Sequence, residues 1–475
     1  MGTYSGSIPA PGQAHDKTRP AGVIVYGWLL LSVLSLVFAG VFALLLALAR
    51  TPVIEAFLPL GRDYIFVALV GHVVLAVVIW FLAFEGFLWI YSASVHIGQC
   101  VWSGILGWAS LAFSGAGVAL VVISALFGLG QAELANYVPV LLTPVFYVGL
   151  GCFALGVLLN LINGMAGVLR ARVNGIRLPN LTIGMAVAAF AIFTAFVCFA
   201  LSAWFQISTG KLFLDFERLF WGGGHILQFA NTISLVTVLM FLAYLICGKE
   251  ALSSGASKVL YGIYLLFIIP APFIFFIYDT SSQAYKDSFT ALMRWGLGPS
   301  TAVFMLAAAI LVFSKKGMSF KRPGFSSLVL AVVIFAAGGT LALMIRGVNT
   351  IIPAHYHSVI GAVTIAFMGL FYELLPAFKR TIYSKKMAAV QPYLYFAGIL
   401  MFALGLYIAG THGVARKTYG SAQNLNSAAR IIGMSVMGLG GLISIAGGIT
   451  FVWNALLTLM RKEDAAAPAF EFDAR

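Results

Sequence analysis

Twelve long apolar stretches, separated by short polar links, limit most strongly what this 475-residue chain can fold into. Each is long enough to cross a bilayer as a helix, which takes about 20 apolar residues. Because backbone N–H and C=O groups in lipid have to be satisfied within the segment, we expect helices and not open sheets. The composition agrees, with 61% hydrophobic and only 9% charged residues. The sequence therefore predicts an all-α polytopic membrane protein, with helices at about residues 22–49, 64–94, 100–128, 138–170, 182–207, 220–247, 257–279, 290–314, 325–347, 353–378, 391–411 and 427–460.

Short polar tails at residues 1–20 and 462–475 flank the expected membrane domain, residues 21–461. With the N-terminus inside, the inner segments hold 18 of the 28 Lys and Arg residues. By the positive-inside rule both termini are expected in the cytoplasm, and we expect a multi-pass protein of the inner (cytoplasmic) membrane. The net charge of +13 is dispersed among loops, so nucleic acid is not an expected partner.

Two histidines separated by one residue, His355 and His357, open the tenth apolar stretch. Successive helical residues turn by about 100°, so these rings should point roughly 200° apart. They cannot easily share one metal ion, but one helix that presents an imidazole to each side suits two haems held on its flanks. The alternative is that both are polar residues lining a helix contact.

Two further histidines are expected at a similar depth. His72 follows Asp63 by nine residues, about 14 Å of helical rise, and His225 follows Arg218 by seven, about 10 Å. Their helices should enter from the same outer face as the helix with the histidine pair, so four histidines from three helices would share one layer. An ionisable ring in lipid is costly without a partner, which makes each a functional candidate, although a neighbouring helix could satisfy it.

The loop after the eleventh stretch, residues 410–419, contains the adjacent cations Arg416 and Lys417. Cations beside a haem layer could pair with propionate carboxylates. A solvated outer loop is the alternative.

In their order and topology these residues resemble the catalytic subunit I of haem-copper oxidases. The resemblance covers nearly all twelve helices. It rests on His72, on Trp221-x-x-Gly-His225, on His355-Tyr356-His357 and on Gly413-x-x-Arg416-Lys417-x-Tyr419.

The resemblance implies two haems. His72 and His357 would be the axial ligands of a low-spin haem, and His355 would be the proximal ligand of a high-spin haem. Arg416 and Lys417 would neutralise propionates.

Trp221 also matches the family, and His225 stands where the family has its first copper ligand and would be the catalytic residue.

The sequence departs from the family at the copper site. The family's seventh helix carries an adjacent His-His pair, but residues 270–278 contain no histidine. Since copper needs about three nitrogen ligands in such a site, one histidine cannot hold it. The family's tyrosine four residues after the copper histidine is Phe229, and its glutamate is Leu227. The glutamates of a nitric oxide reductase iron site are missing too.

Three interpretations follow. The leading one is a divergent electron-transfer subunit of a respiratory chain, with two haems, no copper and an atypical site that could bind a small gas. The second is a working oxygen or nitric oxide reductase, an oxidoreductase whose second metal has ligands that the sequence does not reveal. A twelve-helix transporter would predict inverted repeats, and none is evident.

Two questions stay open at this stage. His225 could hydrogen-bond a ligand on the second haem or bind that iron itself. The electron donor could be cytochrome c, through other membrane or cytochrome subunits of a complex, or quinol, because the chain has no C-x-x-C-H haem attachment and no soluble copper domain.

Overall fold

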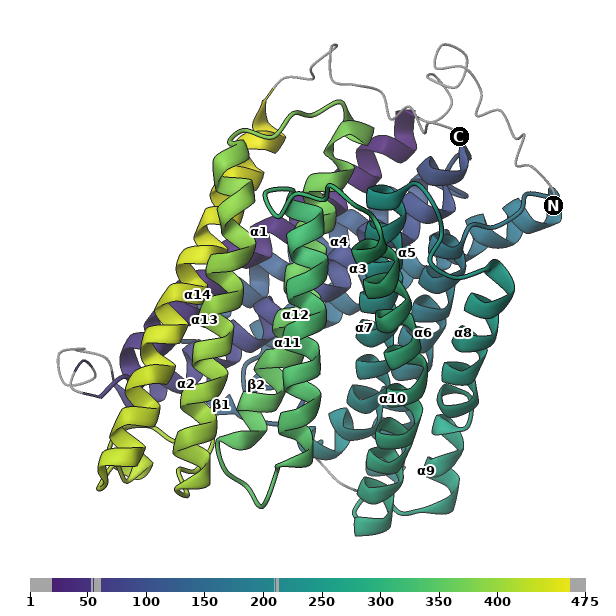
Figure 1. The fold of residues 1–475 in the computed structure, drawn as a ribbon. Helices are drawn as coiled ribbons and strands as arrows, with labels where there is room; N and C mark the ends of the chain where they lie inside the picture. The colour runs from purple at the N-terminus through teal and green to yellow at the C-terminus, as the bar shows by residue number, and fades with distance from the viewer. Residues whose placement is uncertain (1–18, 53, 55–60, 209, 211–212, 462–475) are drawn as a thin grey trace.

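The structure, a computed structural model, describes residues 19–461 except residues 53, 55–60, 209 and 211–212. Within that range the chain is almost wholly helical (Figure 1). Twelve spans are long and apolar enough to cross a membrane, which confirms the expected fold class and number of helices. Of the expected tails, residues 1–18 and 462–475 lie outside the described residues, and α1 already begins at Arg19.

The helices and strands follow one another along the chain without any large sheet. In chain order they are α1 (Arg19–Arg50), α2 (Arg62–Val73), η2 (Val74–Ile79), α3 (Trp80–Ala93), η3 (Val95–Ile97), α4 (Gly104–Leu126), β1 (Ala132–Glu133), β2 (Val140–Leu141), α5 (Pro144–Val173), α6 (Asn180–Ser208), α7 (Phe216–Cys247), α8 (Ser254–Ile268), η4 (Ala271–Phe273), α9 (Ile274–Ile277), α10 (Gln283–Ser314), α11 (Pro323–Leu343), α12 (Ile351–Leu374), η5 (Leu375–Phe378), α13 (Lys385–Thr411), η6 (Gly420–Gln423) and α14 (Ala428–Met460). The strands β1 and β2 form a small antiparallel hairpin between α4 and α5.

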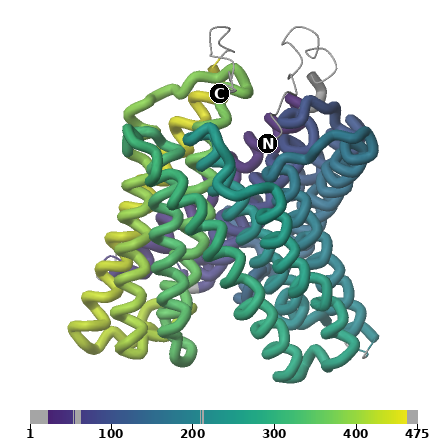
Figure 2. Tube along the Cα trace, turned by 45° about the vertical axis from the view of Figure 1, so that its right-hand side comes forward, coloured from purple at the N-terminus to yellow at the C-terminus, as the bar shows by residue number. Residues whose placement is uncertain are grey.

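Helices α11–α14 lie on one side of the molecule and α8–α10 on another (Figures 1 and 2). The first helix begins, and the last helix ends, on the same face (Figure 1). An even number of membrane spans requires this arrangement.

Helices α7 and α12 occupy the centre. In each, 83% of the most apolar window is buried inside the protein, against 33–61% in the other spans. These are the helices that carry His225 and the His355–His357 pair, so the sequence places its ionisable rings where the protein and not the lipid surrounds them.

The second span is a single continuous helix interrupted by a π-helical segment, η2, which begins two residues after His72. The wider turn of a π-helix changes which residues share a helix face, and such segments occur often at functional sites. Here it separates the histidine of α2 from the aromatic residues of α3.

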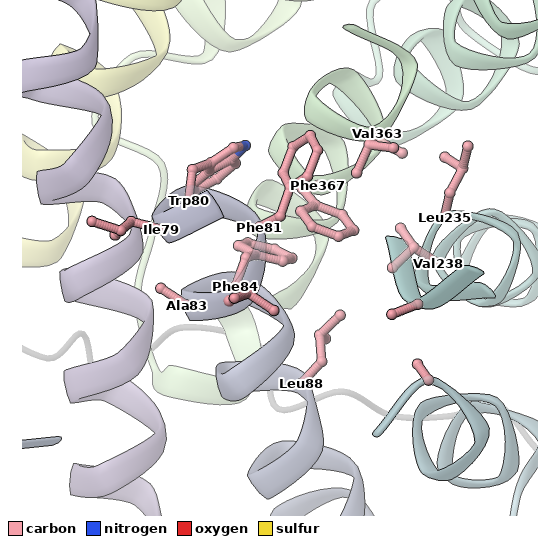
Figure 3. Packing of buried hydrophobic residues seen from close by; sticks show 14 of the residues in the cluster. Ile79, Trp80, Phe81, Ala83, Phe84, Leu88, Leu235, Val238, Val363 and Phe367 are labelled. Atoms are coloured by element: carbon pink, nitrogen blue, oxygen red, sulfur yellow. The ribbon is translucent and has the colours of Figure 1, made fainter. Parts of the chain in front are cut away.

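Those aromatic residues fasten α3 to α12 (Figure 3). The rings of Phe84 and Phe367 stack with centroids 4.5 Å apart, and the ring of Phe81 meets Phe367 edge-on at 5.9 Å. Trp80 packs at 5.2 Å from Phe84 and at 6.2 Å from Phe367. Aromatic pairs in these geometries stabilise a core beyond the area they bury. The cluster therefore holds the helix of His72 in register with the helix of His355 and His357.

Candidate functional site

A cavity of about 1910 Å³ lies among helices α1, α2, α7 and α10–α14. Ligand sites in proteins usually measure about 300–1,000 Å³, so this cavity has room for more than one group of that size. Its wall is mostly apolar and includes the side chains of His72, His355 and His357. Three of the four histidines expected in one layer therefore meet at one cavity.

Each of these three rings is oriented by a hydrogen bond between Nδ1 and a backbone carbonyl oxygen. The bonds are His72 to Ala39 at 3.1 Å, His355 to Gly338 at 2.8 Å and His357 to Pro353 at 2.7 Å. Because a carbonyl oxygen only accepts, Nδ1 carries the proton and Nε2 keeps its lone pair. Metal-binding histidines are commonly held in this way, with the second nitrogen free to bind the metal.

The rings of the histidine pair turn to different neighbours, as their spacing predicts. His355 bonds to Gly338 of α11, whereas the ring of His357 lies 4.7 Å from that of Phe402 on α13. Both residues line the cavity, one beside α11 and the other beside α13.

His225 is placed differently. It is 2% exposed and is not among the residues that line the cavity. Its Nδ1 lies 2.7 Å from the carbonyl oxygen of Trp221, and its Nε2 lies 3.0 Å from the hydroxyl of Tyr137. With Nδ1 donating to the carbonyl, Nε2 accepts from the phenol, so both nitrogens already have partners. The structure does not bring His225 to the cavity with the other three.

Residues 270–278, which contain no histidine, follow the end of α8 and include η4 and α9. In the part of the chain that the structure describes, no group of three or more His, Cys, Asp or Glu side chains is placed to hold a metal ion. Phe229 is fully buried, and Leu227 lines the cavity.

Arg416 and Lys417 also line the cavity, with Trp221. The amide oxygen of Asn136 accepts from Arg416 Nη2 at 2.5 Å and from Lys417 Nζ at 3.1 Å. The backbone and side-chain nitrogens of Asn136 donate to the carboxylate of Glu217, both at 2.6 Å. The network ties the loop after α13, the β1–β2 hairpin and the start of α7 into one unit at the cavity wall.

Lys417 has an unusual backbone conformation and a lowered pKa. It has a left-handed backbone, φ 57°, and its Nζ also donates to the carbonyl oxygen of Leu134. Burial, reinforced by the neighbouring Arg416 and opposed by Glu217, lowers the pKa of Lys417 to about 8. A cation that is this poorly solvated favours an anionic partner.

The sequence did not reveal every residue of the site. Arg50 lines the cavity, and no hydrogen-bond partner is found among the described residues for its buried Nε and Nη2. The sequence did contain a sign of it, because Arg50 is the charged residue that directly follows the first apolar stretch, residues 22–49. Asn136, Tyr137 and Glu217 carry no such signal, since only the folded chain brings their loops to the cavity.

Comparison with known proteins gives a consistent result. The family model described as "Cytochrome C and Quinol oxidase polypeptide I" matches residues 23–456. An uncharacterized protein of Rickettsia prowazekii is 28% identical, over 90% of this chain and 94% of its own length. An uncharacterized protein of Aquifex aeolicus is 31% identical, over 79% of this chain and 89% of its own length. Cytochrome c oxidase subunit 1 of Thermus thermophilus is 22% identical, over 52% of this chain and 48% of its own length.

The fold is also similar to a solved structure, described as a cryo-EM structure of a heme-copper terminal oxidase dimer. The two chains superpose with a TM-score of 0.73 at 18% sequence identity, over 93% of this chain and 84% of the other. The likeness concerns the fold.

Replacing Asn136 by alanine should loosen the loop that carries the two cations. The substitution removes the acceptor shared by Arg416 and Lys417, and hydrogen bonds to charged groups are worth about 1.5–3 kcal/mol each. We expect trypsin to cleave after Arg416 or Lys417 about tenfold faster in the variant, as measured by mass spectrometry of the full-length protein. Equal cleavage rates would mean that Asn136 does not restrain this loop. Gln283→Ala, which removes an exposed hydrogen bond to Asp287 at the start of α10, is the control.

Proposed function

Because the chain belongs to the cytochrome c and quinol oxidase polypeptide I family, we propose that it is a haem-binding electron-transfer subunit of a respiratory chain. It would hold a low-spin and a high-spin haem and no copper. The observation that carries the proposal is the set of three imidazoles, each with Nδ1 tied to a carbonyl and Nε2 left with a lone pair, at one cavity. Three neutral nitrogen ligands from two central helices are what two haem irons require when one is six-coordinate and the other keeps an open position.

His72 and His357 are the proposed axial ligands of the low-spin haem. The two residues come from α2 and α12, which the aromatic cluster of α3 keeps in register. His355 is the proposed ligand of the second haem, and its ring is oriented by a hydrogen bond to the carbonyl oxygen of Gly338 on α11. The different neighbours of the two rings, α11 for His355 and α13 for His357, support one haem on each side of α12.

Polar groups of the wall fit the remaining parts of two haems. A haem carries two propionates, and Arg416 and Lys417 with Trp221 are proposed to bind them. The guanidinium of Arg50 adds a third cation, whose buried Nε and Nη2 have no hydrogen-bond partner among the described residues. Haem iron supplies one-electron redox chemistry and, at an open position, binding of a small gas. The chain itself orients the ligands, neutralises the carboxylates and surrounds the site with apolar side chains that exclude water.

The copper-free second site is supported by the state of His225. Both of its nitrogens are in use, and residues 254–277 contribute no histidine. A copper site needs about three nitrogen ligands, and the neighbourhood of His225 offers aromatic rings instead, from Tyr137, Trp221 and Phe289. Electron transfer, with gas binding at the second haem, needs no copper.

Sidedness and partners follow from the family and the charges. We propose that both termini face the cytoplasm in an inner-membrane protein, since the inner segments hold 18 of 28 Lys and Arg residues. The cavity wall with Arg416 then lies towards the outer face, where cytochrome c or a cytochrome subunit of a respiratory complex could deliver electrons. Quinol is the alternative donor within the membrane.

His357→Ala should abolish the low-spin haem and leave the second haem in place. The substitution deletes one of two axial ligands while the ring of His355, held from α11, keeps its position. We expect the low-spin signals to disappear from the absorption and electron paramagnetic resonance spectra, with about half of the haem retained. His412→Ala is the matched control, since His412 is an exposed outer-loop histidine. Loss of both haems would contradict the separate ligation of the two.

Haem retention should depend on pH through Lys417. Its ammonium loses its proton as the pH rises through about 8, so a carboxylate that pairs with it binds more weakly above that pH. Between pH 7 and pH 9 we expect haem affinity to fall about tenfold, measured as transfer to an excess of a haem-binding acceptor protein. Lys417→Arg keeps its charge at both values and should remove this fall. If the variant and the wild type show the same fall, Lys417 does not bind a propionate.

A further inference from the structure

Tyr137 stands between His225 and the cavity. Tyr137 lines the cavity and its hydroxyl lies 3.0 Å from His225 Nε2, whereas His225 itself is 2% exposed and lies behind it. The two rings are 4.9 Å apart, and Tyr137 also meets Trp221 edge-on at 5.9 Å. The polar group that this part of the wall presents to the cavity is therefore a phenol and not an imidazole.

Three features place the Tyr137 ring. Its backbone has φ 68°, a left-handed conformation that is unfavourable for a residue with a side chain and persists only where the surroundings impose it. The preceding residue, Asn136, is bonded on one side to Glu217 and on the other to Arg416. The ring lies against Gly224 of α7, where any Cβ would overlap it.

His225 is kept out of the cavity by contacts and not by its position on the helix. At 100° per residue it lies about 40° from Trp221 and about 60° from Gln228 on the helical wheel, and both of those residues line the cavity. A change of side-chain rotamer would therefore turn the imidazole towards the open volume. The hydrogen bond to Tyr137 and the bulk of its ring oppose that change.

We propose that Tyr137 is a positioning residue that holds His225 away from the second haem, so that the histidine does not become its sixth ligand. The inference rests on the proposed function, because it concerns the haem bound by His355. In this proposal Tyr137 keeps the sixth coordination position of that haem open, and gas binding depends on that open position. The proposal replaces both roles that the sequence left open for His225, since the tethered imidazole would neither bind the iron nor reach a ligand on it.

The first test compares haem spin state and carbon monoxide binding in the full-length, haem-loaded wild type and in Tyr137→Phe. In the dithionite-reduced wild type we expect about half of the haem to bind carbon monoxide. Phe keeps the ring but leaves His225 Nε2 without its donor, a loss worth about tenfold in an equilibrium. We expect the second haem to shift towards the low-spin form and its carbon monoxide affinity to fall about tenfold.

Three further variants make the result specific. Adding His225→Ala to Tyr137→Phe should restore the high-spin form and carbon monoxide binding, because the competing ligand is gone. Gly224→Ala displaces the ring without removing the phenol and should act like Tyr137→Phe. Tyr64→Phe, which loses a phenol bonded to the carbonyl of Leu126 outside the cavity, should match the wild type. No spectral change in Tyr137→Phe, or no recovery in the double variant, would overturn the proposal.

A second readout does not need haem. Diethyl pyrocarbonate modifies unprotonated imidazole nitrogens, and mass spectrometry of the haem-free protein reports the rate at each histidine. We expect His225 to react about tenfold faster in Tyr137→Phe than in the wild type, with the exposed His412 as the internal reference. Equal rates would overturn the shielding of His225 by Tyr137. A protein that binds no haem would refute the proposed function, and the modification rates would still decide whether Tyr137 shields this histidine.

Discussion

Hydrogen bonds from imidazole to backbone carbonyl oxygens are the interaction on which the site depends. In a membrane interior a polar ring has to find a partner within the protein, and for His72, His355 and His357 that partner binds Nδ1. The bond satisfies Nδ1, sets the tautomer and leaves Nε2 with its lone pair in a residue that lines the cavity. The same physical requirement that makes an intramembrane histidine costly thus prepares it as a metal ligand. The central, protein-surrounded positions of α7 and α12 make such bonding possible.

His225 obeys the same rule with a different outcome. Its Nδ1 is tied to a carbonyl like the others, but Tyr137 occupies its second nitrogen. The hydroxyl of Tyr137 therefore makes the His225 ring unavailable as a ligand. In the proposed copper-free site, this bonding of His225 agrees with the absence of histidine from residues 270–278 and with the phenylalanine at position 229. The second haem would then keep an open coordination position because Tyr137 holds His225 away from its iron.

The sequence predicted the fold well, and it predicted less of the wall of the site. Apolar length alone specified twelve spans, and the i, i+2 spacing predicted different neighbours for the rings of His355 and His357, because both follow from helix geometry. The β1–β2 hairpin could not be foreseen. Asn136 and Tyr137 reach α7 and the loop after α13 across about 80 and 280 residues of chain, and no local pattern encodes that contact. For the same reason the hydrogen bond between Tyr137 and His225 could not be predicted, since Tyr137 comes from that hairpin.

The central claim is that three histidines hold two haem irons and that no copper completes the second site. The most direct test is the metal content of the purified full-length protein, with iron and copper measured by mass spectrometry and haem measured by its pyridine haemochrome. The account predicts two haem irons per chain and no copper. One copper for every two haems would contradict the copper-free site and indicate a working oxygen or nitric oxide reductase, and a protein without haem would contradict the account as a whole.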